Sequence, residues 1–179
     1  MAYIELFGLG GSGKTTLAKK WAREKGYIAR PLVKKSKTDF ILCFPLIYFF
    51  KALKFTLKYK VRKPLKTSFD LSVNRYYYNK YKNTSQTFVN DHGFIQTLAP
   101  KTSIEQWEDE RFIEELKLLI PKDADMYYVR KDWETTMNQF MKRNNLKRTK
   151  NQEKRFRKAY KLSEKRFSIL KKAFGAKLA

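Results

Sequence analysis

The chain has 179 residues, which is enough for one domain with a hydrophobic core and too few for two domains of usual size. A hydrophobic content of 42% and an aromatic content of 16% exclude a disordered chain, and a single cysteine, Cys43, excludes an intramolecular disulfide. The formal net charge of +23 favours an anionic partner such as nucleic acid, a membrane surface or an acidic polymer, unless the lysines only keep the protein soluble.

The first predicted elements surround a glycine-rich loop. Residues 3–7 are expected to form a short buried strand, and residues 16–25 a helix that ends at Gly26. Between them, residues 8–15 read Gly-Leu-Gly-Gly-Ser-Gly-Lys-Thr and fit the phosphate-binding pattern G-x-x-x-x-G-K-[ST]. Because the pattern stands in the strand–helix context that it requires, we predict that this phosphate loop binds a nucleoside triphosphate together with Mg²⁺.

The residue types of the phosphate loop follow from the chemistry of phosphate binding. Glycines allow the backbone to curl so that successive N–H groups point at phosphate oxygens, and the positive end of the following helix adds to the attraction. Lys14 is expected to reach the β- and γ-phosphates and to act in catalysis, while the Thr15 hydroxyl would ligate Mg²⁺. The predicted nucleotide-binding residues are Gly8, Gly10, Gly11, Ser12, Gly13, Lys14, Thr15 and Thr16.

A second strand is predicted over 27–30, ended by Pro31, and a polar loop over 34–38. Residues 40–50 are the most apolar stretch of the chain, but the run is too short to span a bilayer. From Pro45 to about residue 60 it continues as a helix with apolar side chains on one face and lysines on another, namely Lys51, Lys54 and Lys58. Such a basic amphipathic helix, extended by the basic flank to Lys66, either lies on an anionic membrane surface or packs on its own domain.

The second half of the chain alternates between helices and strands. A helix rich in tyrosine is predicted over 67–84, and a strand over 86–91 should carry Asp91 to its carboxyl tip. Ser103, with Gln106 at the capping-box position, opens a predicted helix. The remaining expected elements are that helix over 104–119, a strand over 126–130, a helix over 133–142, a basic loop over 142–151 and a basic helix over about 152–174.

Strands that alternate with helices around a phosphate loop predict a three-layer α/β/α fold with a parallel sheet of four to five strands. We expect one domain over 1–179, with a helical insertion at about 38–84. Switch-type GTPases need the motifs D-x-x-G and N-K-x-D, and ABC-type ATPases need L-S-G-G-Q. The sequence contains none of these motifs, so the small-molecule kinases are the class that remains.

Three stretches resemble the thymidylate-kinase-like P-loop kinases: residues 7–17, Val-Asn-Asp-His-Gly-Phe-Ile-Gln at 89–96, and Pro-Lys-Asp-Ala-Asp at 121–125. More narrowly, the chain resembles kinases found among capsule and cell-surface polysaccharide synthesis proteins. Those proteins show an acidic-Gly-x-x-Gln stretch after the third strand and a helical insertion before it. The resemblance implies ATP and Mg²⁺ as cofactors, and transfer of the γ-phosphoryl group to an acceptor hydroxyl on a sugar or glycan intermediate.

The chain departs from this family pattern in two ways. His92 follows Asp91 at the position where thymidylate kinases carry an arginine, which weakens a role on nucleoside monophosphates. The chain also runs only a few residues past Phe174, so the fifth strand of these kinases would be short or missing.

Asp91 is the candidate catalytic and metal-linked carboxylate. At a strand tip facing the phosphate loop it could hold a Mg²⁺-bound water or act as general base on the acceptor hydroxyl. The alternative is that Asp91 caps the turn at His92 and Gly93. We expect acceptor contacts at Arg30, His92 and Gln96. Arg30 is equally compatible with a surface arginine and Gln96 with a structural role, and His92 could act as a base, although a lone histidine is more often a structural hydrogen-bonding residue.

The basic loop at 142–151 corresponds to the mobile lid of the resembled kinases. Arginines of such a lid stabilise charge on the transferring phosphoryl group, which makes Arg143 and Arg148 the candidate catalytic arginines. Lys142 and Lys147 compete with them for this role.

Three functions therefore stand beside one another. The leading one is an ATP-dependent kinase of a small molecule or surface glycan, and the second is a nucleoside or nucleotide monophosphate kinase. The third is a nucleotide-dependent nucleic-acid-binding protein, ranked last because the sequence shows no nucleic-acid-binding module. We expect a cytoplasmic protein, since the first strand begins too early for a signal peptide, with the inner face of the membrane as an open partner.

Overall fold

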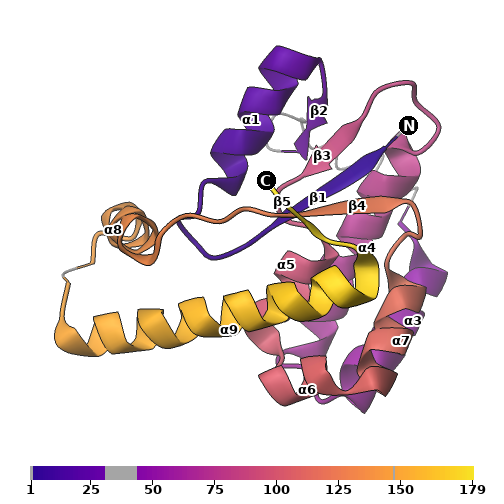
Figure 1. Cartoon of the computed structure of the whole chain (residues 1–179). Coiled ribbons are helices and arrows are strands. Elements are labelled where there is room, and N and C mark those ends of the chain that lie inside the picture. Colours follow the sequence, from indigo (N-terminus) through magenta and orange to yellow (C-terminus); the bar gives the residue numbers. More distant parts are fainter. Residues whose placement is uncertain (1, 31–43, 147) are drawn as a thin grey trace.

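The computed structural model of the chain describes residues 2–30, 44–146 and 148–179 (Figure 1). Pro31, the polar loop predicted over 34–38, the part of the apolar run from Phe40 to Cys43, and Lys147 lie outside the described residues. The strands are β1 (Tyr3–Phe7), β2 (Ile28–Ala29), β3 (Phe88–Asn90), β4 (Ala124–Tyr128) and β5 (Lys177–Leu178). The longer helices are α1 (Lys14–Lys25), α3 (Leu46–Lys58), α4 (Pro64–Tyr81), α7 (Glu110–Leu119), α8 (Trp133–Arg143) and α9 (Lys150–Phe174).

The strands form one parallel sheet in the order β2-β3-β1-β4-β5, which confirms the predicted α/β fold. The central strand β1 pairs with β3 on one side and with β4 on the other. A fifth strand is present and short, and the backbone N–H of Ala179 donates to Tyr128 O at 3.1 Å to extend this edge. Strand β4 lies two residues earlier than the predicted 126–130, because its register on β1 begins at Ala124 opposite Tyr3.

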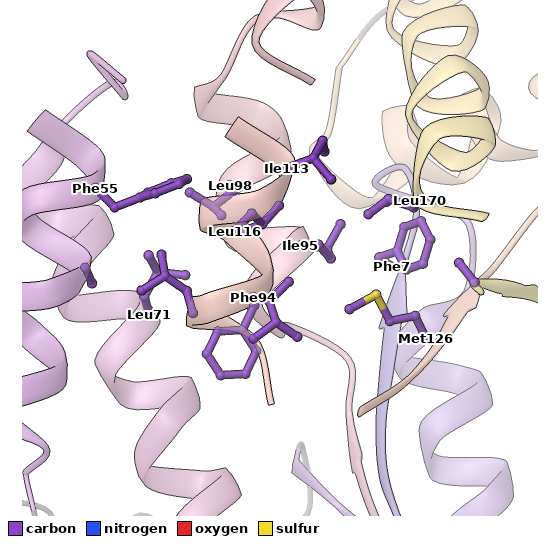
Figure 2. Close-up of a cluster of buried hydrophobic side chains, with 14 of the residues drawn as sticks. Phe7, Phe55, Leu71, Phe94, Ile95, Leu98, Ile113, Leu116, Met126 and Leu170 are labelled. Carbon is purple, nitrogen blue, oxygen red and sulfur yellow. The ribbon is translucent and has the colours of Figure 1, made fainter. Parts of the chain in front are cut away.

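Helices cover both faces of the sheet, as Figure 1 shows, with α1 on one face and α4, α5 (Phe94–Leu98) and α9 on the other. Side chains of β1 alternate between the two faces. Ile4 and Leu6 pack with Ala18 of α1, whereas Tyr3 and Phe7 join the larger cluster on the opposite face. Figure 2 shows α5 at the middle of this cluster, between the sheet and the insertion, with Phe7, Phe55, Leu71, Phe94, Ile95, Leu98, Ile113, Leu116, Met126 and Leu170 labelled.

The predicted helical insertion contains α3 and α4, which pack along each other. Small polar side chains line their contact, where the Thr56 and Ser68 hydroxyls are 2.9 Å apart. Within α4, the Ser72 hydroxyl donates to Ser68 O at 2.8 Å. Phe55 and Ala52 of α3 are buried in the core, and Phe49 and Leu53 are partly buried. One face of α3 therefore packs on its own domain, while the face described below stays exposed.

One predicted helix needs correction, and two short helical elements had no prediction. The helix predicted over 104–119 is two helices, α6 (Ile104–Glu108) and α7, because Asp109 has an extended backbone and its carboxylate accepts from the Arg111 N–H at 2.9 Å. The short helix α5 and the 3-10 turn η2 (Ala99–Lys101) after it were not expected from the sequence. The predicted capping box at Ser103 is confirmed, and a second one at Thr149 starts α9 at Lys150.

Candidate functional site

The phosphate loop joins the carboxyl end of β1 to the first turn of α1, as the motif predicts. Gly11 and Gly13 have φ values of 89° and 92°, a left-handed backbone that favours glycine. The Lys14 ammonium donates to Gly8 O at 2.9 Å and Leu9 O at 2.7 Å, so it lies inside the curl of the loop. Burial lowers the pKa of Lys14 to about 8. A partly buried cation held in this curl is positioned to meet phosphate oxygens.

Thr15 and Asp91 lie side by side although 76 positions separate them in the sequence. The Thr15 hydroxyl donates to Asp91 Oδ2 at 2.6 Å. A hydroxyl and a carboxylate in this arrangement fit Mg²⁺, which takes few protein ligands and completes its shell with phosphate oxygens and waters. Within the described residues no group of three or more His, Cys, Asp or Glu side chains gathers elsewhere as a metal site.

Glu5, which sequence reasoning did not select, binds the first N–H groups of α5, while the His92 N–H in the turn before this helix donates to Asn90 Oδ1 at 3.0 Å. The buried Glu5 carboxylate accepts from the N–H groups of Phe94 at 2.9 Å, Ile95 at 2.6 Å and Gln96 at 3.3 Å. A Cβ atom on Gly93 would lie 2.3 Å from Glu5 Cδ, so only glycine fits there. Burial raises the pKa of Glu5 to about 7, against the lowering effect of the three N–H donors.

The acceptor candidates Arg30, His92 and Gln96 lie at the same edge of the sheet, and the side chains of Arg30 and Gln96 have partners inside the protein. Gln96 Oε1 accepts from the Gly8 N–H at 3.2 Å, which ties α5 to the phosphate loop. Arg30 Nη1 donates to Asn74 Oδ1 and Asn90 Oδ1, both at 3.0 Å, and to the His92 carbonyl at 2.5 Å. Partial desolvation, followed by the nearby Arg30 charge, lowers the pKa of His92. Arg30 and Gln96 therefore already have structural partners.

The two arginines proposed for the lid differ in their surroundings. Arg143, at the end of α8, is near enough for its charge to contribute to the lowered pKa of Lys14. Arg148 instead forms ion pairs with Glu153 at 2.5 Å and Glu134 at 3.7 Å within the lid region. The structure thus brings Arg143 toward the phosphate loop and holds Arg148 on other partners.

Helix α8 packs directly on the phosphate loop. A Cβ atom on Gly11 would lie 2.5 Å from Thr136 O, and one on Gly10 would lie 3.0 Å from Phe140 Cδ2. Lys131, in the segment between β4 and α8, has its Nζ atom 3.5 Å from the Cβ position of Gly13. Sequence reasoning missed Lys131; its place just after the predicted strand 126–130 is the signal that could have found it.

A cavity of about 320 Å³ borders the first half of the phosphate loop. Its walls come from the loop, from α5 and from α9, and the polar side chains among them are Gln96, Ser163 and Arg166. A larger hollow of about 750 Å³ lies between Trp133 and the basic face of α9, and none of its lining residues belongs to the phosphate loop. The smaller cavity is therefore the one connected with the candidate chemistry.

No family model and no curated protein matches this sequence. Among solved structures, a deoxyadenosine kinase from M. mycoides with the products dCMP and a flexible dCDP bound has a TM-score of 0.54 at 16% identity, covering 99% of this chain and 89% of that one. The same kinase with bound dATP also has a TM-score of 0.54 at 16% identity, with coverages of 99% and 90%. A shikimate kinase from Acinetobacter baumannii in complex with shikimate has a TM-score of 0.48 at 14% identity, with coverages of 100% and 83%.

This chain thus combines, in one fold, a phosphate loop, the Thr15–Asp91 contact and an all-parallel sheet. In fold, this chain is similar to the small-molecule P-loop kinases.

Proposed function

We propose that this protein is an ATP-dependent phosphotransferase that moves the γ-phosphoryl group of ATP to a hydroxyl of a small acceptor. The observation that carries the proposal is the Thr15–Asp91 hydrogen bond of 2.6 Å next to the curled phosphate loop. It joins a predicted metal ligand to a predicted catalytic carboxylate across two elements. The fold similarity to a deoxyadenosine kinase that binds dATP supports a nucleotide in this loop.

Each part of the proposed reaction has a candidate among the described residues. The loop N–H groups and Lys14 hold the β- and γ-phosphates, and Mg²⁺ on Thr15 and Asp91 would neutralise their charge. The acceptor oxygen attacks the γ-phosphorus, the bond from that phosphorus to the β–γ bridging oxygen breaks, and ADP leaves. Asp91 or a water on it takes the acceptor proton, and Arg143 stabilises charge on the transferring group.

The acceptor that we favour is a sugar or a glycan intermediate. A role in surface polysaccharide synthesis rests only on the sequence resemblance of residues 89–96 and of the helical insertion before them. A nucleoside is the second candidate, favoured by the TM-score of 0.54 with deoxyadenosine kinase. Only the net charge favours a nucleic acid.

We also propose that α3 touches an anionic membrane surface, which would place the kinase beside membrane-bound acceptors. Apolar side chains on one side of α3 remain exposed to solvent, namely Ile47 (78% exposed), Phe50 (59%) and Leu57 (57%). Beside them lie the exposed lysines Lys51, Lys54 and Lys58, of which Lys58 pairs with Glu115 of α7. No helix in the described part of the chain is long and apolar enough to cross a bilayer, so contact would be at the surface.

ADP formation with a panel of sugars, lipid-linked glycans and nucleosides tests the proposal. The unmodified protein should form ADP with at least one acceptor, and Lys14→Ala and Asp91→Asn should each lower kcat by a factor of about 100 or more. Lys19→Ala is the matched control and should keep full activity, because Lys19 lies at an exposed position of α1, the helix that begins at Lys14. Circular dichroism checks that each variant folds.

Each result bears on a different part of the proposal. Unchanged turnover in Asp91→Asn would leave the metal and base roles without support, since the asparagine keeps the size and removes only the charge. The absence of ADP formation with every acceptor, in a protein that binds ATP, would overturn the kinase assignment.

A further inference from the structure

Arg166 of α9 lies at the wall of the 320 Å³ cavity, without a counter-charge among the described residues. Its Nη2 donates to Thr102 O at 2.9 Å, while its Nε atom is buried and has no hydrogen-bond partner in the part of the chain that the structure describes. No charged group in the described part of the chain shifts the pKa of Arg166, which burial alone lowers. The guanidinium is therefore held half-buried by one backbone carbonyl.

The neighbouring basic residues, unlike Arg166, have carboxylate partners. Lys165, one position before, pairs with Glu108 at 2.5 Å, and Arg130 pairs with Glu164 at 3.3 Å. Both cations are more than half exposed and could remain hydrated without a partner. Arg166 has less access to water and no carboxylate, which is the costly combination. Arg166 lines the cavity and carries a charge that no carboxylate among the described residues offsets, which indicates that the cavity receives an anionic group.

The position of the cavity connects Arg166 with the proposed reaction. One wall is formed by residues 8–10, the first half of the phosphate loop, and another by Ile95 and Gln96 of α5. Helix α5 follows directly after Asp91 and His92, so the cavity and the catalytic carboxylate share one segment of chain. A molecule in this cavity would lie beside the loop that holds the triphosphate.

The size and lining of the cavity limit what fits. A volume of about 320 Å³ is at the small end of the range for ligand sites, which suits a compact molecule of monosaccharide size. The apolar walls Phe7, Leu162 and Leu170 would cover its carbon skeleton, and few polar groups would orient it. Arg166 would then meet the anionic end of the molecule in the fork geometry that guanidinium offers to carboxylate or phosphate.

We propose that this cavity binds the acceptor and that Arg166 binds a carboxylate or phosphate group on it. The acceptor class is thus a small hydroxyl compound that already carries an anionic group, such as a sugar acid or a sugar phosphate. This inference rests on the proposed kinase function, because it takes the cavity beside the phosphate loop as the acceptor site.

Matched pairs of compounds test the charge requirement. Glucuronate and glucose, and glycerol 3-phosphate and glycerol, differ within each pair mainly in one anionic group, and the two pairs separate carboxylate from phosphate. Binding is measured by calorimetry with the loop occupied by a non-hydrolysable ATP analogue and Mg²⁺, and KM and kcat are measured from ADP formation. We expect at least one anionic member to bind tenfold or more tightly than its neutral partner.

Arg166→Met should remove that preference by raising Kd and KM for the anionic member about tenfold or more, with a smaller change in kcat and unchanged affinity for the ATP analogue. Arg155→Met, which removes the same charge from an exposed position on α9, is the control and should change neither value. If Arg166→Met fails to fold, Arg166→Lys should still bind the anion but less tightly, because it loses the fork geometry.

Any of three binding results would overturn the inference. The first is equal binding of the charged and neutral members of each pair, and the second is no binding by any anionic compound. The third is undiminished binding of the anionic compound by Arg166→Met. ADP formation with a neutral acceptor alone would leave the kinase proposal intact while rejecting the role of Arg166, whereas charge-dependent binding without ADP formation would reject the kinase proposal and keep the anion site.

Discussion

At the scale of single residues, Glu5 has the least usual environment in the site. A carboxylate inside the interface between sheet and helix loses its hydration, and three backbone N–H groups of α5 replace part of it. The same helix carries Gln96, which accepts from the Gly8 N–H. Glu5 therefore positions α5 against the phosphate loop without reaching the reacting atoms.

The raised pKa of Glu5 has a consequence for stability. Between its ordinary value of 4.5 and about 7, the folded state holds a proton that the unfolded chain has released, so stability falls as the pH rises through this window. Relative to Glu5→Gln, the unmodified protein should lose on the order of 3 kcal/mol of unfolding free energy between pH 4.5 and pH 8. Urea denaturation of both proteins at several pH values measures the difference.

Glu24→Gln, at an exposed position of α1, is the control for removing one negative charge from this basic protein. A difference between the unmodified protein and Glu5→Gln that does not change with pH would mean that Glu5 titrates in the folded state as it does in the unfolded chain.

At the scale of elements, the contact between α8 and the phosphate loop determines the position of α8, which leads into the lid predicted over 142–151. Thr136 O and the Phe140 N–H lie 2.5 Å and 3.0 Å from the position that a Cβ of Gly11 would take. Because α8 ends at Arg143, this packing also brings that arginine toward Lys14. The glycines thus allow the close approach of a helix to the loop for which we propose phosphate binding.

Substitution of Gly11 by alanine separates these contacts from backbone strain. Gly11→Ala should lose about 1–3 kcal/mol more unfolding free energy than Gly26→Ala, because both positions have positive φ but only Gly11 meets α8. Urea denaturation of the two variants provides the comparison. Equal losses at the two positions would contradict the close packing of α8 on the loop.

At the scale of the whole molecule, the positive charge is spread over surfaces with different neighbours. Helix α9 combines lysines and arginines with few apolar exposed side chains, and Arg157 lies 4.1 Å from the centre of the Trp133 ring. Helix α3 instead combines its lysines with exposed apolar side chains. Only the second combination provides both attractions that a membrane surface offers, namely apolar burial and anionic head groups.

Co-sedimentation with liposomes that contain phosphatidylglycerol, at physiological salt, tests the membrane proposal. The unmodified protein should sediment, and a variant with Lys51, Lys54 and Lys58 changed to Glu should not, because each lysine contributes about 1 kcal/mol near such a surface. The matched control changes Lys154, Lys158 and Lys161 of α9 to Glu and alters the net charge equally. If the unmodified protein stays in solution, or both variants lose binding alike, α3 is not a membrane surface.

The sequence by itself determined the parts of this protein that depend on neighbouring residues. The strand, the loop at 8–15 and α1 follow one another in the chain, so residue pattern and phosphate chemistry predict them together. The capping box at Ser103 is local for the same reason. Asp91 was predicted from its position after a strand, because the carboxyl ends of parallel strands meet at one edge of a sheet.

Tertiary structure alone decided the parts that depend on distant partners. Glu5 looks like an ordinary strand residue until α5, about 90 positions away, brings three N–H groups to it. Helix α5 is too short to show a period in the sequence, and its burial between sheet and insertion stabilises it instead (Figure 2). Arg166 is one of many basic residues on α9. Only the fold shows that this arginine lines the cavity beside the phosphate loop and lacks a carboxylate partner among the described residues, because burial depends on packing and not on local sequence.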